Sequence, residues 1–227
     1  SVTIKNGAIG KYAFQGCTSL TSVTMETAAE GGVTTGVTSI SGNAFRNCTS
    51  LTSVNIPNTV TTIEGLAFGG CNALTSITIA EGNATYKAVD NCIIEKASNT
   101  LVVGCSTSII PTDGSVTSIA SYAFNSCTTL TAITIPDSVT SIGNYAFCNC
   151  TSLTEITIPS KVTIIGGGAF QGCTGLTSVT MVDGVDCTIG SYAFDGCTAL
   201  AELTLSNNIT SIASYAFQNC TALEEIK

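Results

Sequence analysis

Histidine is absent from this chain of 227 residues. Ser-His-Asp and Cys-His catalytic sites need an imidazole base, so both are excluded. Three consecutive glycines, Gly166 to Gly168, lack the lysine that follows them in a phosphate-binding loop. Paired carboxylates can act without histidine, but nothing in the sequence pattern implies a pocket around the acidic residues. We therefore predict that the protein is not an enzyme.

The chain also contains no Cys-x-x-Cys pair, although it has 12 cysteines. Structural zinc sites surround one ion with four Cys or His ligands, which often come from closely spaced pairs. With neither such pairs nor histidine, we expect no metal site and no cofactor.

Basic residues are scarce as well. The 7 Lys and Arg stand against 15 Asp and Glu, which gives a formal net charge of −8. Phosphate backbones and anionic membrane surfaces are bound by clustered basic side chains, so we expect no nucleic-acid partner. No apolar run approaches the roughly 20 residues of a membrane-spanning helix. We therefore expect no direct insertion into a membrane.

What the chain does contain is a repeat. An Ala-Phe pair occurs eight times, with Ile five residues before the Phe, Cys three residues after it and Leu six residues after it. The intervals between successive Phe residues are 31, 23, 56, 23, 23, 24 and 23 residues, so the period is 23 with three interruptions. Such a period is typical of a solenoid, whose coils bury their apolar faces against one another. The repeat Phe residues are Phe14, Phe45, Phe68, Phe124, Phe147, Phe170, Phe194 and Phe217.

Each unit contains a short alternating segment, such as the Ile-Thr-Ile of residues 133–135. β-Branched residues that alternate with a period of two predict a half-buried strand. Pro57, Pro136 and Pro159 directly follow such segments. Proline has no amide hydrogen for a ladder, so it marks the end of the strand. The chain is then predicted to return through a tight turn of helical character over residues 146–150.

The motif I-x-x-x-A-F-x-x-C-x-x-L-x-x-I-x-I-P, which runs from Ile142 to Pro159, resembles the BspA-type class of leucine-rich repeats. The segment from Tyr86 to Pro111 resembles the hairpin-bearing variant unit of such proteins. The resemblance implies a leucine-rich repeat solenoid, which is a right-handed parallel β-solenoid of about 9–10 coils. Its short strands would be concave and its turns or short helical pieces convex, with one variant hairpin unit near residues 81–111. It also implies an extracellular location on a cell surface and a role in attachment.

We expect residues 1–227 to form a single leucine-rich repeat domain. The chain begins in a predicted strand, at Val2 and Ile4, and ends in another, at Leu223 and Ile226. Neither end has the polar capping unit that closes a solenoid. The domain is therefore expected to be a fragment of a longer chain.

One exposed strand position, between the two aliphatic residues of each strand, is polar in seven units. In two of them a glutamate stands two residues earlier. Binding hot spots are usually rich in aromatic and Arg residues, which are missing here, and Thr also simply suits an exposed strand. The candidate interaction surface consists of Thr24, Asn55, Thr78, Thr134, Thr157, Thr180, Thr204, Glu155 and Glu202.

Three functions are compatible with this face. The first is a non-catalytic adhesion or protein-interaction module, whose partner is a surface or matrix protein of a host or neighbouring cell and whose avidity compensates for weak contacts. The second is a structural spacer without a ligand. The third is ice binding by a regular Thr array, although Glu155 and Glu202 break the array. Binding to matrix proteins distinguishes the first from the second, and thermal hysteresis tests the third.

Eight cysteines occupy the same place in the repeat and are therefore predicted to be buried and free. Their Cβ bonds run parallel on stacked coils, which does not favour disulfides. Cys92, Cys105, Cys148 and Cys187 are off register. We expect Cys148 to be exposed, because the residues in phase with it are polar.

Cys92 and Cys105 flank a predicted β-hairpin with a polar turn at residues 97–99. If Glu95 faces Leu101 or Val102, the two cysteines lie within reach of a cross-strand disulfide. A register shift of one residue turns every side chain to the other face, and the alternative is that both thiols are buried and reduced. The pair is thus a candidate disulfide with both outcomes open.

The interval of 31 residues before Phe45 exceeds the period of 23 by 8, and this surplus lies in residues 26–36. Surplus length in a solenoid goes into a loop. Long loops often carry binding residues, although drift by insertion also produces them.

Overall fold

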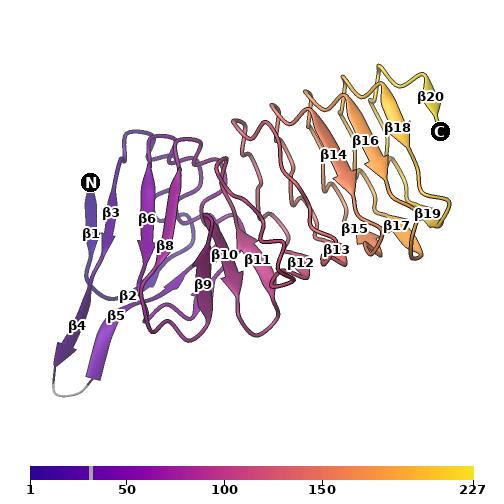
Figure 1. The fold of residues 1–227 in the computed structure, drawn as a ribbon. Coiled ribbons are helices and arrows are strands. Elements are labelled where there is room, and N and C mark those ends of the chain that lie inside the picture. The colour runs from indigo at the N-terminus through magenta and orange to yellow at the C-terminus, as the bar shows by residue number, and fades with distance from the viewer. Residues whose placement is uncertain (31–32) are drawn as a thin grey trace.

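The computed structural model describes residues 1–30 and 33–227, which form a parallel β-solenoid of about nine coils (Figure 1). A typical coil has three sides, namely a first strand, a second strand and a turn that contains the Ala-Phe pair. No helix occurs among these residues. The predicted solenoid class is confirmed. The tight turn predicted over residues 146–150 is confirmed, since residues 144–149 form turns, but these turns do not form a helix.

The first strands of successive coils form what we call the first strand ladder. Its strands pair in parallel and in register, as Thr157 does with Thr180. Side chains alternate along each strand, so that Ile156 and Ile158 are buried while Thr157 is exposed. The strands are β1 (Val2–Ile4), β3 (Val23–Met25), β6 (Ser53–Ile56), β8 (Ser76–Ile79), β14 (Glu155–Ile158), β16 (Ser178–Met181), β18 (Glu202–Thr204) and β20 (Glu225–Ile226).

The second strand ladder lies on another side of the coils and consists of short strands that end at the repeat Ile. Its C-terminal part is an eight-stranded sheet in the order β19-β17-β15-β13-β12-β11-β10-β9. The regular strands are β2 (Gly7–Ile9), β5 (Val33–Ile40), β7 (Thr62–Ile63), β12 (Ser118–Ile119), β13 (Ser141–Ile142), β15 (Ile164–Ile165), β17 (Cys187–Ile189) and β19 (Ile209–Ile212).

The variant unit supplies three strands to this sheet. They are β9 (Tyr86–Val89), β10 (Cys92–Glu95) and β11 (Thr100–Val103), with β10 antiparallel to both of the others. β11 then pairs in parallel with β12 and restores the regular ladder. The hairpin predicted from the sequence is therefore present, and β9 is a further strand that the sequence did not reveal.

The variant unit also divides the apolar core in two. Ile93 and Val103 pack with the N-terminal coils. Ile94 and Leu101 pack with the C-terminal coils. Because neighbouring residues of a strand point to opposite faces, the same short hairpin can close one core and open the next.

The surplus residues before Phe45 form a second hairpin. β4 (Thr27–Glu30) pairs antiparallel with the start of β5, with Thr27 opposite Gly36. The surplus is thus ordered by strand pairing rather than being a simple loop. Residues 31–32 of this segment lie outside the described residues.

The turn side depends on two backbone positions with positive φ in each regular coil, two residues before the Phe and two residues after it. Tyr145 (φ 55°) and Asn149 (φ 60°) are one such pair. The later position holds Gly, Asn or Ser. The earlier position is mostly Tyr, for which positive φ is unfavourable. Ring stacking offsets part of this strain, since Tyr122 stacks on Tyr145 at 5.4 Å and Tyr192 on Tyr215 at 5.0 Å.

Inside the turns, the repeat Phe rings form two stacks. Neighbouring ring centroids lie 5.0–5.4 Å apart, and the planes differ by at most 7°. The first stack runs from Phe14 to Phe68 and the second from Phe124 to Phe217. Gly104 of the variant unit lies against the ring of Phe124, where any larger side chain would collide with it. The aromatic stack is therefore interrupted at the variant unit.

The repeat cysteines link the coils beside these stacks. The Cys173 thiol donates to the carbonyl oxygen of Phe147 at 3.1 Å, and the same oxygen accepts the N–H of Cys150 at 3.1 Å. Equivalent thiol donors are Cys48, Cys71, Cys150, Cys197 and Cys220. All twelve cysteines are free. Burial raises the pKa of the Cys173 thiol to about 12.

Burial of the cysteines differs from the prediction at several positions. Cys17 is exposed, while Cys127 and Cys220 are only partly buried. Cys148, predicted to be exposed, is buried at 7% exposure. The N–H of Ser126 donates to the carbonyl of Cys148 and holds the neighbouring coil close. The in-phase side chains of that coil can then cover the short side chain of Cys148.

Replacing Phe147 by Ala should lower the free energy of unfolding by roughly 3–5 kcal/mol, because the ring lies between two stacked neighbours in a one-dimensional core. Urea denaturation measures the change. Phe147→Leu is the matched control and should cost clearly less, since it keeps most of the apolar volume. A Phe147→Ala protein with an unchanged midpoint would contradict the role of the stack.

The buried thiols should make the protein less stable in alkali. An unfolded thiol ionises near pH 8.5, whereas Cys173 keeps its proton to about pH 12. Between these values the folded state binds the extra proton, so stability is complete below pH 8.5 and falls as the pH rises, by roughly 2 kcal/mol from this thiol at pH 10. Urea midpoints at pH 7.5 and 10 under reducing conditions test this. Cys173→Ala should show a smaller fall, and an equal fall in both proteins would argue against the assignment.

Candidate interaction surface

All nine residues of the predicted surface are exposed, and eight of them lie in strands of the first strand ladder. Register pairing brings Asn55 next to Thr78 and aligns Thr157, Thr180 and Thr204 in one row. The buried aliphatic residues on either side of each position fix this outward orientation. The sequence therefore identified positions that share one face of the solenoid.

Threonine has two roles in the first strand ladder. Just after the repeat Leu it links coils, as when the hydroxyl of Thr177 donates to the carbonyl oxygen of Thr154 at 2.9 Å. Thr157, Thr180 and Thr204 are different, because their hydroxyls have no hydrogen-bond partner within the part of the chain that the structure describes. These outward hydroxyls are available to water or to a partner.

The first strand ladder is broken between β8 and β14, and β3 is joined to β6 only by an isolated bridge between Ser22 and Ser53. The strand predicted at residues 133–135 is not formed, and Thr134 lies in an irregular segment. The corresponding segment of the preceding coil, around Ile109, is held by the variant unit, because the N–H of Ile109 donates to the carbonyl of Asp90 at 3.0 Å. The Thr positions therefore form two separate tracks rather than the continuous array that the ice-binding hypothesis needs.

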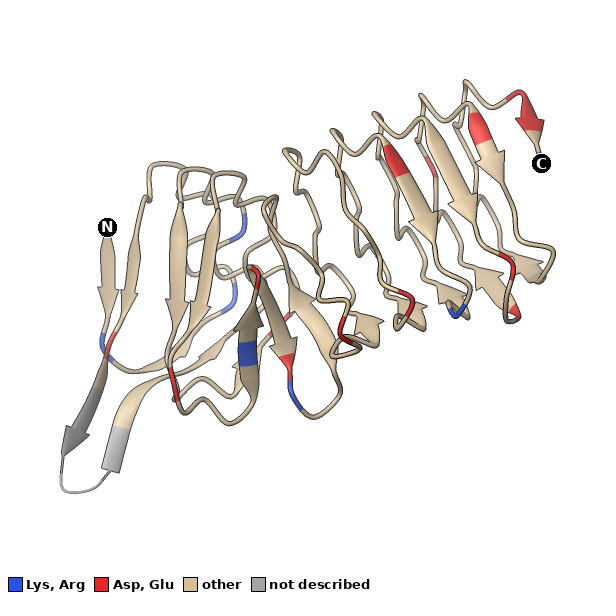
Figure 2. Ribbon diagram, viewed as in Figure 1, with Lys and Arg blue, Asp and Glu red and all other residues tan. Residues whose placement is uncertain are grey.

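The C-terminal track is acidic. Glu155, Ser178, Glu202 and Glu225 are successive register partners on β14, β16, β18 and β20, and the three carboxylates are exposed (Figure 2). The N-terminal track carries serine at the same position, for example Ser53. Glu155 and Glu202 were predicted from the sequence and Glu225 was not, although all three stand two residues after a repeat Leu.

The candidate disulfide between Cys92 and Cys105 is not formed. Glu95 pairs with Thr100, but a register shift between Ile93 and Ile94 sets Ile93 opposite Val103, so that Cys92 lies one place from Cys105. The two thiols pack in different cores, Cys92 in the C-terminal one and Cys105 in the N-terminal one. Both cysteines are buried and free, which is the second of the two alternatives that the sequence left open.

Each of these two thiols has its own polar neighbour. Cys92 Sγ donates to the carbonyl of Ile109 at 3.5 Å, and Cys105 Sγ lies 3.3 Å from Thr107 Oγ1. Burial raises the pKa of Cys92 to about 12. A thiol with so high a pKa is a poor nucleophile at neutral pH.

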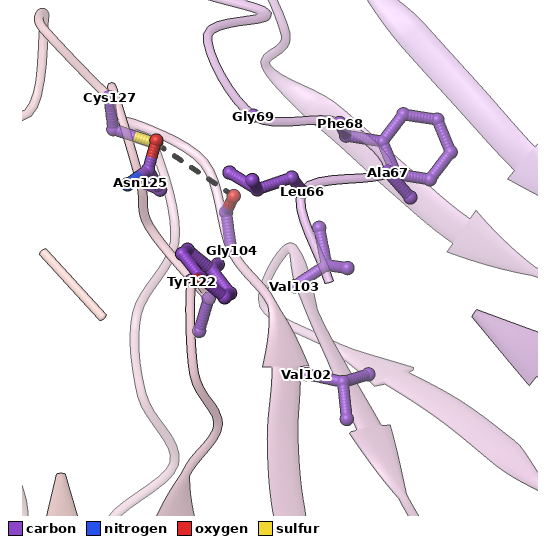
Figure 3. Close-up of a pocket in the computed structure, with 11 residues that line it drawn as sticks. Leu66, Ala67, Phe68, Gly69, Val102, Val103, Gly104, Tyr122, Asn125 and Cys127 are labelled. Carbon is purple, nitrogen blue, oxygen red and sulfur yellow. Dashed lines mark hydrogen bonds between the residues drawn. The ribbon is translucent and has the colours of Figure 1, made fainter. Parts of the chain in front are cut away.

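A small cavity lies where the variant unit meets its neighbours (Figure 3). In it, the Cys127 thiol points toward the carbonyl of Gly104 at 4.0 Å. The volume is about 10 Å³, which accommodates at most one water molecule. This cavity is therefore a packing irregularity and not a ligand site. Among its lining residues are Leu66, Phe68, Val103, Gly104, Tyr122 and Cys127.

Neither a metal site nor a membrane span emerges from the described residues. No cluster of three or more Cys, Asp and Glu side chains in residues 1–30 and 33–227 is arranged to hold an ion. The same residues include no helix suited to crossing a bilayer.

Thiol labelling tests the state of Cys92 and Cys105. In the native protein the exposed Cys17 should react fastest with a chromogenic disulfide reagent. In denaturant without reductant, all twelve thiols should react. Cys92→Ala should then lose one reactive thiol. If a disulfide were present, the same variant would instead gain one, because Cys105 would be released.

The sequence pattern of the BspA-type leucine-rich repeat region matches residues 1–99 and 98–224 in 6 copies. A comparison with curated proteins gave no match.

Solved structures share the fold over nearly the whole chain. A leucine-rich cell-surface protein of Faecalibacterium prausnitzii is 34% identical with a TM-score of 0.75, and the match covers 100% of this chain and 59% of that one. A leucine-rich repeat protein of Eubacterium ventriosum is 27% identical with a TM-score of 0.69, covering 97% and 63%. The pneumococcal vaccine antigen PcpA, 23% identical with a TM-score of 0.74, covering 99% and 56%, shows the same fold.

The chain thus spans between 56% and 63% of the length of these three proteins. The repeat match extends over both sides of the variant unit. It includes the Phe stacks and the repeat cysteines whose thiols bond to the neighbouring coil. The chain belongs to the BspA-type leucine-rich repeat family.

Proposed function

We propose that this chain is a non-catalytic adhesion module that acts outside the cell and binds a surface or matrix protein of a host or neighbouring cell. Its family supports this proposal, because BspA-type leucine-rich repeat proteins suggest interaction or adhesion modules. So does the likeness to a protein described as a leucine-rich cell-surface protein.

The observation that carries the proposal is the extended row of exposed polar positions on the first strand ladder. Thr157, Thr180 and Thr204 present unpartnered hydroxyls at regular strand spacing. A face of this kind suits a large partner rather than a small molecule, because each contact is weak and many must add together. A small ligand would instead need a pocket that surrounds it.

The negative charge of the C-terminal track indicates which partners would bind there. Glu155, Glu202 and Glu225 line one edge of the C-terminal track (Figure 2). Complementary charges guide encounter and suppress wrong partners, so the partner should present a basic patch to this half of the face.

Binding to immobilised fibronectin, collagen and laminin tests the proposal. Thr180→Arg places a long basic side chain in the middle of the acidic track and should weaken binding by roughly tenfold. Thr174→Arg is the matched control, because it makes the same charge change on the same coil at an exposed turn residue and should leave binding unchanged.

Two results would contradict the proposal. If both variants bind equally weakly, recognition depends on net charge and not on the strand face. If none of the matrix proteins binds the chain, the spacer hypothesis, which needs no ligand, replaces adhesion.

A further inference from the structure

The break in the first strand ladder leaves a backbone segment without partners. Residues 132–135 make no backbone hydrogen bond to any part of the chain that the structure describes. Just before the segment and just before β14, the N–H of Thr154 donates to the carbonyl of Thr131 at 3.4 Å. Ile135 is nevertheless buried. Ala132 and Thr134 are exposed, and backbone N–H and C=O groups in folded proteins pair either with protein or with water, so the groups of this segment are available to a partner strand.

The facing edge of β14 is also free. The carbonyls of Thr154 and Ile158 accept hydrogen bonds from the β16 side, from Thr177 at 2.8 Å and Val182 at 3.0 Å. Backbone groups alternate in direction along a parallel strand. Glu155 and Thr157 therefore direct their N–H and C=O groups away from β16, toward residues 132–135.

A groove separates these two edges. Its volume is about 380 Å³, within the size range of ligand pockets, and it is lined by residues 132–135 and 155–157 with Asp137, Pro159 and Val182. The same two coils remain in contact elsewhere, since Ile142 pairs with Ile165 on the second strand ladder. The opening is thus confined to the first strand ladder, and the rest of the coil holds its two edges in place.

The lining of the groove specifies what would occupy it. Unpaired groups along both edges call for the backbone of an extended peptide, which adds a strand to an exposed sheet edge. Val182, which is 45% exposed, and the half-buried Ile133 offer apolar contacts. Asp137 and Glu155 are the only charged residues in the lining. A basic residue in the occupant would neutralise them.

A second, smaller groove of about 200 Å³ lies on the other side of residues 132–134, next to Ile109. It contains no charged residue. Charge complementarity therefore favours the groove beside β14 for a basic peptide.

We propose that the groove between residues 132–135 and β14 accepts one extended, basic peptide strand of the partner, which completes the first strand ladder. The proposal rests on the proposed function, and it gives the partner a chemistry: an exposed strand or unfolded segment in which Lys or Arg alternates with aliphatic residues.

The probe is a synthetic octapeptide of alternating Lys and Val, blocked at both ends. Amide hydrogen exchange measured by NMR should be fast at Glu155 and Thr157 in the free protein and slow at least about tenfold at saturating peptide. A peptide with Glu in place of Lys should not slow it. A Lys-Val peptide that is N-methylated at alternate residues keeps its charge but loses one edge of donors, and it should bind roughly tenfold more weakly.

Substitutions in the groove test separately what backbone hydrogen bonds and what charge contribute to the affinity for the peptide. Thr157→Pro removes a donor from the free edge of β14, where proline is tolerated, and should weaken peptide binding by roughly tenfold. Thr157→Val is its matched control, because it keeps the backbone N–H and changes only the side chain, and it should weaken peptide binding clearly less than Thr157→Pro does. Glu155→Gln combined with Asp137→Asn should weaken binding by roughly three- to tenfold and reduce its salt dependence.

Slow exchange of Glu155 and Thr157 in the free protein would overturn the proposal, because the two coils would then pair directly. Equal binding of the N-methylated peptide would also overturn it, since only charge would be recognised. If the Lys-Val peptide protects these amides while no matrix protein binds, the acceptor groove stands and the adhesion function fails. If matrix proteins bind but the peptide protects nothing, the groove fails and adhesion stands.

Discussion

Stacking of coils about one strand spacing apart is the constraint on which this structure depends. Each coil is too thin to enclose a core of its own, so its apolar residues are buried only by the coils on either side. Phe147 shows how this works, because its ring lies 5.0 Å from Phe124 and 5.2 Å from Phe170. The carbonyl of the same residue accepts hydrogen bonds from the Cys173 thiol and the Cys150 N–H. Polar and apolar links between coils therefore coincide at one residue.

The variant unit shows what happens when this regularity is interrupted. Its hairpin keeps the second strand ladder continuous through β11 and β12, but Gly104 separates the two Phe stacks. On the first strand ladder the next regular coil has no strand at residues 132–135. The two ladders and the turns thus respond differently to the same insertion, and the irregularity remains on the side that carries the exposed polar positions.

The exposed side chains of the first strand ladder are small and polar, and they differ between its two halves. Its N-terminal half presents Ser and Asn among threonines, whereas its C-terminal half carries Glu155, Glu202 and Glu225. The face lacks the aromatic and Arg residues of compact hot spots. Recognition by such a surface has to rely on extent, on charge and on backbone groups left free at a strand edge.

The sequence by itself determined the coil. A period of 23 residues fixes which side chains face inward, so the burial of Phe147, Cys150 and Ile156 and the exposure of Thr157 followed from spacing alone. Local hairpin signals also located β10 and β11.

Tertiary structure decided everything that depends on the identity of the adjacent coil. Residues 133–135 have a strand sequence but no strand, because a ladder needs a partner at the right distance and the variant unit occupies the preceding place. Cys148 is buried although its in-phase neighbours are polar, because close stacking covers a short side chain whatever its neighbours are. Cys92 and Cys105 are free because Cys92 packs in the C-terminal core and Cys105 in the N-terminal core, and the core that each side chain joins is set by packing on both faces of the hairpin rather than by its own residues.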